Sequence, residues 1–391
     1  MKFGYTVFDQ TPAEVSRLVK QSVSAGDHAV DLAMTTCQEA FGLASGGYLS
    51  ELSGIPNIDL SHPWWDQGSI RDLSIAHRQY YAMNSLCLLA DNFTAAVFFN
   101  KDMIVSNALE DPYALADSGK WTWDKMYEMA KNVSADTDSD GKMTDKDTYG
   151  MVGSFNLMMD SMMNCNEPII VKDADDLPVF ALNTQRAADV GEALLGILAD
   201  THHVLLVDRY IGQYNDAWQD LMYPAFMSGK CLFVARAYVQ YVYYFRESSA
   251  NYGILPRPKY DAEQKDYSSD INYAWATTFM IPKDVKDPAM AGLITEALAK
   301  ASLQYVTPAN YDVSIVTKQL RDTDSERMLD IIYASRHYDM GQFTDFSTMK
   351  ASLVDMLKKN EFTFGSDYAS VKPKTEKNIE KFVEEFSQIE D

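Results

Sequence analysis

Residues 5–34 read YTVFDQTPAEVSRLVKQSVSAGDHAVDLAM, a stretch in which the pattern of a strand gives way to that of a helix and then returns. Residues 5–8 predict a first strand because aromatic and β-branched residues dominate them. Residues 29–34 are mostly apolar, as expected of a buried parallel strand. Strand, helix and strand with short connections form a βαβ unit, so the sequence predicts an α/β fold. The helix is delimited by an N-cap, a proline in its first turn, a capping-box glutamate and a terminating glycine, at Thr11, Pro12, Glu14 and Gly26.

The rest of the chain repeats this alternation. Apolar runs at residues 95–99, 231–234 and 277–282 predict three further strands. Apolar residues at helical spacing indicate three amphipathic helices, the last of them in the C-terminal tail. The apolar faces of these helices comprise Trp123, Met126, Tyr127, Ala130 and Val133; Met290, Leu293, Ile294, Ala297, Leu298 and Ala301; and Ile379, Phe382, Val383 and Phe386.

Length and composition limit the possible functions. A chain of 391 residues suggests two or three domains, and 47% hydrophobic residues can build sizeable cores. The 56 acidic against 34 basic residues give a net charge of −22, which makes nucleic acid or an anionic membrane face a poor partner. No window approaches the roughly 20 apolar residues of a membrane span. The four cysteines lack metal-ligand spacing and are interpreted as small buried residues: Cys37, Cys87, Cys165 and Cys231.

An acidic loop at residues 136–147 fits the EF-hand calcium pattern. Its oxygens are spaced to wrap one hard cation, and Gly141 allows the sharp turn at position six. Position twelve is the short Asp147, and a strand is predicted after the loop where an EF-hand has its second helix. A solvated acidic turn is therefore the alternative to one structural Ca²⁺. The predicted ligands are Asp136, Asp138, Asp140, Lys142 through its carbonyl, Thr144 and Asp147.

Aromatic residues are abundant, with 23 tyrosines and 6 tryptophans. Sugars present apolar faces and hydroxyl edges, so aromatic rings beside polar side chains are typical of carbohydrate sites. The candidates are Trp64, Trp65, Trp218 and Trp275, although an aromatic ring is more often part of a core. Trp275 differs because it follows the polar run 268–272 and precedes a predicted strand, a usual place for a site in open α/β folds.

Motifs of common enzymes are absent from the sequence, which contains no GxSxG, HExxH, GxxxxGK[ST] or GxGxxG. The adjacent His202 and His203 are interpreted as surface residues. A pair of carboxylates for glycoside hydrolysis stays an alternative, because the sequence gives no separations among its acidic residues. The sequence therefore favours a binding protein over an enzyme.

Several short motifs, in order along roughly 300 residues, resemble the family 1 extracellular solute-binding proteins, the sugar-binding receptors of ABC importers, and especially their Firmicutes branch. Each motif is short, so the resemblance depends on their order and spacing. The motifs lie at residues 29–32 with 47–52 (GYLSEL), 96–102 (AVFFNKD), 121–124 (WTWD), 136–150 (the acidic loop), 225–231 (AFMSGKC), 252–259 (YGILPRPK) and 321–330 (RDTDSERMLD).

The resemblance implies a two-lobed periplasmic-binding-protein-like fold of type II, with hinge-connected discontinuous lobes and the ligand in the cleft between them. Lobe 1 would comprise residues 1–94 plus 270–308, and lobe 2 residues 95–269 plus 309–391. The implied function is to bind an extracellular carbohydrate or oligosaccharide and deliver it to the permease subunits of an ABC importer. Aromatic character and position in this fold together select the ligand-binding candidates Thr35, Thr36, Trp64, Trp65, Arg236, Tyr238 and Trp275.

Members of this family begin with a signal sequence, a lipidated cysteine and a first strand and helix, none of which is apparent before residue 5. We therefore expect an N-terminally incomplete lobe 1 with exposed strand edges, which favour association. The full-length protein would be an extracellular, membrane-anchored lipoprotein, monomeric when complete, with Ca²⁺ as its one cofactor. A peptide or polyamine is the alternative ligand. The alternative functions are a carboxylate-dependent glycan-degrading hydrolase and a calcium-dependent surface interaction protein.

Overall fold

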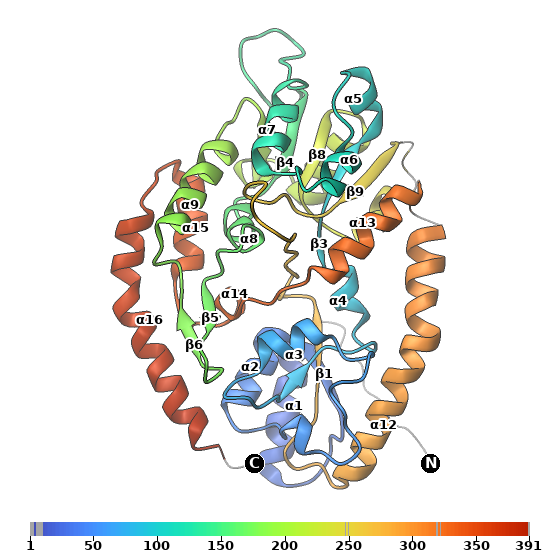
Figure 1. Ribbon diagram of the computed structural model, residues 1–391, viewed down its shortest axis with the longest axis vertical. Helices are drawn as coiled ribbons and strands as arrows, with labels where there is room; N and C mark the ends of the chain where they lie inside the picture. The colour runs from blue at the N-terminus through green and yellow to red at the C-terminus, as the bar shows by residue number, and fades with distance from the viewer. Residues whose placement is uncertain are drawn as a thin grey trace.

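Two β-sheets, one in each half of the molecule, organise the computed structural model (Figure 1). The structure describes Gly4, residues 11–246, Ser248, residues 250–317, Leu320 and residues 322–389. The strand predicted at residues 5–8 lies outside these residues. Lobe 1 is the half around the three-stranded sheet, and lobe 2 is the half around the five-stranded sheet.

Both sheets combine strands from distant parts of the sequence. The order in lobe 1 is β1-β10-β2, with antiparallel pairings, and the order in lobe 2 is β7-β4-β8-β3-β9. In lobe 2, β4 is parallel to β7 and β8, while β3 is antiparallel to β8 and β9. The strands are β1 (Ala33–Thr36), β2 (Tyr81–Ala82), β3 (Ala95–Asn100), β4 (Tyr149–Gly153), β7 (Val204–Leu206), β8 (Cys231–Tyr238), β9 (Tyr252–Leu255) and β10 (Thr277–Met280), with β5 (Ile170–Lys172) and β6 (Pro178–Phe180) as a separate hairpin.

Helices cover the sheets, and two long ones flank both lobes: α12 with its continuation on one side and α16 on the other (Figure 1). The α-helices are α1 (Pro12–Ala25), α2 (Cys37–Ser45), α3 (Gln67–Leu73), α4 (Leu88–Asn92), α5 (Lys101–Ser106), α6 (Pro112–Asp117), α7 (Trp123–Lys131), α8 (Leu157–Asn164), α9 (Gln185–Leu198), α10 (Tyr223–Met227), α11 (Tyr241–Phe245), α12 (Pro288–Ala301), α13 (Thr323–Ala334), α14 (Met340–Phe343), α15 (Met349–Lys359) and α16 (Phe364–Ser387). The 3-10 and π-helical turns are η1 (Leu52–Gly54), η2 (Val207–Tyr210), η3 (Trp218–Met222), η4 (Ser302–Val306) and η5 (Ala309–Thr317).

The first helix of lobe 1 begins and ends as predicted. α1 starts after Thr11, and Gly26 ends it at φ 63°, a left-handed conformation that glycine adopts without strain. The predicted capping box is wrong. Among the described residues the Thr11 side chain accepts no cap hydrogen bond, and the Glu14 carboxylate instead accepts hydrogen bonds from Arg17.

The strand after α1 differs from the prediction. β1 begins later than the expected strand at residues 29–34, and its described partner β10 is antiparallel to it. The preceding residues are held in a turn, because the Asp284 carboxylate accepts a hydrogen bond from the N–H of His28 and the Ser22 hydroxyl accepts one from the N–H of Ala29. The strand predicted at residues 29–34 is therefore wrong in position, whereas its predicted parallel partner at residues 5–8 lies outside the described residues and that pairing stays a prediction.

The other predicted strands are confirmed as β3, β8 and β10, and β3 is buried along its whole length. The predicted tail helix is confirmed as α16, which buries Ile379, Phe382 and Phe386. All four cysteines are buried and free, as interpreted from their spacing. Within the described part of the chain, no helix combines the length and the apolar character needed to cross a membrane.

Helix α12 is present as predicted, but its apolar residues are not its buried face. The side chain of Leu293 is 53% exposed, and Met290 and Leu298 are exposed as well. The helix instead buries small and polar residues, because the Glu296 carboxylate accepts hydrogen bonds from the indole N–H groups of Trp64 and Trp65. One strong polar anchor therefore decides which face of this helix turns inward.

Three segments lie side by side where the lobes meet, and we call residues 93–95, 269–272 and 335–337 the crossing segments. The first two carry the chain from one lobe to the other, and the third lies beside them between α13 and α14. The first and second are joined by an antiparallel bridge between Thr94 and Ile271, with a hydrogen bond from the N–H of Ala95 to the carbonyl of Asp270 (2.8 Å). The second and third are joined by a parallel bridge between Ser269 and Arg336. Each lobe is therefore assembled from separate stretches of the chain; the exact boundaries at 94, 269 and 308 stay a prediction.

A substitution at Gly150 tests how closely β4 packs on α7. An added Cβ would lie 2.3 Å from the Cα of Ala130, which forces the strand away from the helix. We expect Gly150→Ala to lower the free energy of unfolding by about 1–3 kcal/mol, measured by urea unfolding with tryptophan fluorescence. The control is Gly196→Ala on α9, where no described atom lies within 4 Å of the added Cβ and alanine should be neutral or stabilising by about 0.5–1 kcal/mol. Equal losses for both variants would contradict the packing argument.

Candidate functional site

Three aromatic rings follow one another where the chain crosses between the lobes, and we call Trp275, Phe93 and Tyr238 the aromatic strip. The Trp275 ring stacks on Phe93 with centroids 6.2 Å apart and an interplanar angle of 17°. Phe93 in turn meets Tyr238 edge to face at 6.1 Å. Trp275 is 59% exposed because a turn in which its N–H donates to the carbonyl of Asn272 directs it away from the core. The strip thus joins lobe 1, the first crossing segment and the end of β8.

A positively charged side chain lies beside the strip. The guanidinium of Arg236 on β8 lies 5.5 Å from the ring centroid of Tyr238 and 5.5 Å from that of Trp218. Its Nε donates to Oδ2 of Asp160 on α8 at 2.6 Å. A charge-assisted hydrogen bond of this kind fixes the plane of the guanidinium, so Arg236 is held in place between the two rings.

A buried layer of polar groups supports Arg236 from below. Asp160 also lies 4.0 Å from Nη2 of Arg257, whose Nη1 donates to the carbonyl of Ala235 (2.7 Å). Asn164 donates through Nδ2 to Oδ1 of Asp270 in the second crossing segment (3.1 Å). Burial, and next the charge of Asp160, raise the pKa of Asp270 to about 6. The side chains under the strip are therefore tied to the segments that join the lobes.

The structure brings together three of the seven ligand-binding candidates predicted from sequence, namely Arg236, Tyr238 and Trp275. Tyr238 is only 3% exposed and supports the strip from inside, so Trp275 is the ring among the three that is open to a ligand. Among the described residues, the other four make no hydrogen bond or ring contact with the strip, although Thr36 pairs with Thr277, two residues after Trp275. Thr35 and Thr36 are buried in β1, and the Thr35 hydroxyl donates to the carbonyl of Pro12.

Trp64 and Trp65 are anchored by Glu296 on α12, and Trp65 is 2% exposed. The prediction that Trp65 faces a ligand is therefore corrected, because its ring is packed in the core of lobe 1.

Sequence reasoning missed two residues of the site. Phe93 directly precedes the apolar run of β3 and carries no signal that separates it from core aromatics. Asp160 stands in a methionine-rich helix, where a lone carboxylate has no recognisable spacing to Arg236. Trp218 was noted for its aromatic ring alone, and its place beside Arg236 depends on the packing of η3 against the end of β8.

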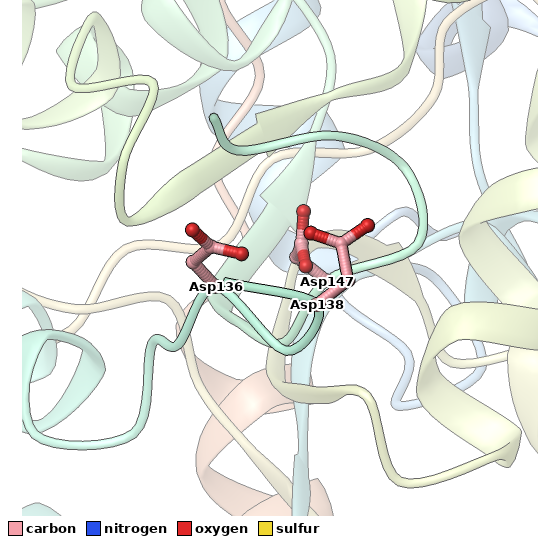
Figure 2. A group of neighbouring side chains, drawn as sticks. All are labelled: Asp136, Asp138 and Asp147. Atoms are coloured by element: carbon pink, nitrogen blue, oxygen red, sulfur yellow. The ribbon is translucent and has the colours of Figure 1, made fainter. Parts of the chain in front are cut away.

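The acidic loop forms a second cluster, between α7 and β4. Oxygens of Asp136, Asp138 and Asp147 lie within 4.8 Å of one another, and Figure 2 shows the three side chains together. Oδ1 of Asp136 is buried and has no hydrogen-bond partner among the described residues. Gly141 adopts φ 83°, as the sharp turn requires, and its N–H donates to Oδ2 of Asp136. The loop is followed by β4 and not by a helix, as the sequence predicted.

Asp147 is bound more tightly than the other carboxylates of the loop. Burial raises its pKa, but hydrogen bonds from the backbone and side chains of Thr137 and Thr144 outweigh burial and hold the pKa at about 2. Thr144 thus lies within hydrogen-bond distance of Asp147, and Asp140 accepts a hydrogen bond from the N–H of Lys142. Oxygen-only chemistry and the unpartnered Oδ1 of Asp136 fit a hard cation such as Ca²⁺.

No protein-family model matches the chain, and no curated protein sequence matches it. Solved structures do. A sugar transporter from Rhizobium etli in an open conformation is similar with a TM-score of 0.61 and 14% identity, over 98% of this chain and 91% of that one. The maltose-binding protein MalE of Listeria monocytogenes in complex with maltose is similar with a TM-score of 0.58 and 15% identity, over 99% and 91%.

A third similar structure is UgpB of Mycobacterium tuberculosis in complex with glycerophosphocholine, with a TM-score of 0.57 and 14% identity over 97% of this chain and 88% of that one. At these identities the likeness establishes the fold. The prediction of two hinge-connected α/β lobes of the periplasmic-binding-protein type is therefore confirmed.

The raised pKa of Asp270 predicts a pH dependence of stability. The folded protein holds this proton more tightly than the unfolded chain, so the free energy of unfolding falls as the pH rises from 3.8 to about 6. Asp270→Asn removes the cost of ionising a buried carboxyl group, and its amide oxygen can still accept a hydrogen bond from Asn164. We measure the free energy of unfolding of both proteins by urea unfolding. From pH 4.5 to pH 7.5, we expect the value for Asp270→Asn to increase relative to that of the wild type by on the order of 2 kcal/mol. Asp355→Asn, on the surface of α15, is the control, and a wild-type profile parallel to that of Asp270→Asn would contradict the assignment.

Proposed function

We propose that this chain is the solute-binding component of an ABC importer and that it binds a carbohydrate or oligosaccharide at the aromatic strip. One observation carries the proposal: the exposed Trp275 ring, stacked on Phe93 beside Tyr238 and Arg236, where the chain crosses between two lobes. Lobes joined in this way can close around a ligand by rotating about the crossing segments.

The chemistry of the strip suits a sugar. The apolar face of a pyranose ring stacks on a flat aromatic ring, and its hydroxyls accept hydrogen bonds from a fixed guanidinium. The charge of Arg236 is offset by Asp160, which favours a neutral solute over a phosphate-bearing one. Among the structural neighbours both kinds occur, maltose in MalE and glycerophosphocholine in UgpB, so ligand charge is the property that separates the two possibilities.

Partners and location follow from the same proposal. A solute-binding component delivers its ligand to the permease subunits of the importer, and we propose that the protein acts outside the cell as a membrane-anchored lipoprotein. The net charge of −22 is consistent with a protein that binds neither nucleic acid nor an anionic lipid surface.

A glycan-degrading hydrolase is the alternative function. Two carboxylates of the polar layer beside the strip, Asp160 and Asp270, are both buried, and each is hydrogen-bonded to a protein side chain. Asp91, two residues before Phe93, is paired with Arg336. Hydrolysis requires one carboxyl group to reach the glycosidic oxygen and the other to reach the opposite face of the sugar. We therefore favour binding, and product analysis with purified protein and a panel of glycans separates the two functions.

A ligand screen tests the proposed function. A solute that binds only the folded protein stabilises it by about 2.7 kcal/mol at a hundredfold excess over its dissociation constant. We expect neutral mono- or oligosaccharides to raise the melting temperature, and Trp275→Ala to weaken their binding by about three- to tenfold through loss of stacking. Tyr305→Ala is the control, because Tyr305 is 67% exposed on η4, outside the strip. A cooperative melt that no sugar shifts would contradict the carbohydrate assignment.

We also propose that the acidic loop binds one structural Ca²⁺. Asp136, Asp138 and Asp147 would supply carboxylate oxygens, and Asp140, the carbonyl of Lys142 and Thr144 are the further ligands expected from the loop pattern. The ion would neutralise three neighbouring carboxylates and clamp the connection between α7 and β4. If the strip bound no solute while the loop bound calcium, a calcium-dependent interaction protein would become the better description.

Calcium titration tests this loop. We expect millimolar Ca²⁺ to raise the melting temperature of the wild type. Asp136→Asn should abolish the rise because it removes the negative charge of the carboxylate whose Oδ1 has no hydrogen-bond partner among the described residues. Asp147→Asn is avoided, since it would break the hydrogen bonds that shape the loop. Asp355→Asn, on the exposed face of α15, is the matched control. An equal rise in wild type and Asp136→Asn would place the calcium effect outside the loop.

A further inference from the structure

The β5–β6 hairpin reaches from lobe 2 to lobe 1. It leaves lobe 2 after α8 and returns to it before α9, and Figure 1 shows its tip beside the helices of lobe 1. Residues 173–177 form the turn of the hairpin, and residues 74–77, which follow α3, are the segment of lobe 1 that the turn meets.

Four hydrogen bonds join the hairpin to this segment, and one ion pair within the hairpin holds the two side chains that make three of them. Nζ of Lys172 donates to the carbonyl oxygen of Ser74 at 3.2 Å and to its hydroxyl at 2.7 Å. The N–H of Ala76 donates to the carbonyl of Asp176 at 3.0 Å, and the N–H of His77 donates to its Oδ2 at 2.9 Å. Lys172 and Asp176 form the ion pair, and both side chains are largely buried.

The backbone at this contact is strained on both sides. Ala76, His77 and Asp176 have φ values of 51°, 61° and 60°, a left-handed region that residues with a Cβ rarely adopt. Each such residue costs of the order of 1 kcal/mol and persists only where surrounding contacts hold it. Local turns hold these residues: reciprocal backbone hydrogen bonds between Ile75 and Arg78 (3.0 Å each) close the turn at Ala76 and His77, and the N–H of Asp176 donates to the carbonyl of Asp173 (3.1 Å) within the hairpin turn. The polar contacts between hairpin and lobe 1 join these two turns to each other.

Packing beside the hairpin is incomplete. A cavity of about 410 Å³ lies between α3, β5 and residues 337–340, next to the third crossing segment. The base of the hairpin is fixed, because Asp339 accepts hydrogen bonds from the N–H groups of Ile169 (2.7 Å) and Ile170 (3.0 Å). The hairpin is therefore anchored at its base in lobe 2, while its tip is held on lobe 1 by directional polar contacts with open space alongside.

The hairpin and the aromatic strip lie on opposite flanks of the crossing segments. The strip contains Phe93 of the first segment, and the base of the hairpin is bound next to the third, with the second segment between them. A rotation about the middle segment that brings the lobes together on the flank of the strip separates them on the flank of the hairpin.

We propose that the β5–β6 hairpin is an interlobe latch, in which the contacts of Lys172 and Asp176 with residues 74–77 hold the lobes in the arrangement seen here and must yield when the lobes close over the aromatic strip. The latch then sets the fraction of molecules competent to close. The apparent dissociation constant equals the intrinsic one divided by that fraction. A weaker latch raises the fraction and therefore gives tighter binding without any change at the site.

Interlobe distances measured by pulsed electron paramagnetic resonance test the latch without a ligand. Spin labels on Ser24→Cys in α1 and Asn132→Cys after α7 report on the two lobes, and the native cysteines are buried. The test variant is Lys172→Met/Asp176→Asn, which removes both charges and leaves no unpaired ion. The matched control is Lys359→Met/Asp355→Asn, an ion pair of the same spacing on the exposed face of α15.

We expect the latch variant to broaden or shift the distance distribution and the control to superimpose on wild type. His77→Gly is a second variant that keeps the N–H and relieves the left-handed strain, so it should narrow the distribution. Distributions that superimpose for all variants, in proteins that melt cooperatively, would overturn the latch. If only the double variant fails to melt cooperatively, His77→Gly decides the question.

An affinity measurement adds a second arm, which rests on the proposed function. With maltose as the probe, we expect the latch variant to bind about fivefold more tightly or better, and His77→Gly more weakly. Unchanged affinity in both variants would show that the latch does not control closure and would overturn the proposal. Failure of the wild type to bind maltose would speak against the choice of sugar, while the distance measurement would still decide on the latch.

Discussion

The backbone hydrogen bonds among the three crossing segments are the constraint on which the rest of the structure depends. They bring Phe93, Ser269 and Arg336 side by side although these residues are far apart in sequence. The strip, the buried polar layer and the base of the hairpin are all built on or beside these segments. Because backbone groups that lose water must be paired, the segments hold one register, and the two lobes have a fixed common axis.

The polar layer beneath the strip shows how charged side chains are buried beside the crossing segments. Asp160 lies between Arg236 and Arg257, and Asp270 receives a hydrogen bond from Asn164. Burying one of these charges alone would cost several kcal/mol, whereas a connected set offsets most of that cost and fixes the geometry of its members. The guanidinium of Arg236 is oriented by Asp160, which belongs to the same buried layer as Asn164 and Asp270 of the second crossing segment.

Polar anchors also override hydrophobic patterning elsewhere in the fold. The apolar residues of α12 predicted one buried face, yet Glu296, bound by two indole N–H groups, turns the opposite face inward. The turn at Ser22, His28 and Asp284 likewise delays the start of β1. In both places one carboxylate with several donors outweighs the modest gain from burying a few exposed apolar side chains.

The sequence alone determined the α/β class, the ends of α1, the apolar runs of β3, β8 and β10, and the acidic loop between a helix and a strand, because these depend on neighbours close in sequence. It also selected Arg236 and Tyr238 from their positions after a predicted strand, and Trp275 from its position between a polar run and a predicted strand. Only the tertiary structure decided that Phe93 and Asp160 complete this group, that Trp65 is core, and that Lys172 and Asp176 meet Ser74 and His77. Those contacts join residues tens to hundreds of positions apart, and no local pattern of spacing or polarity records which distant segments the crossing strands will bring together.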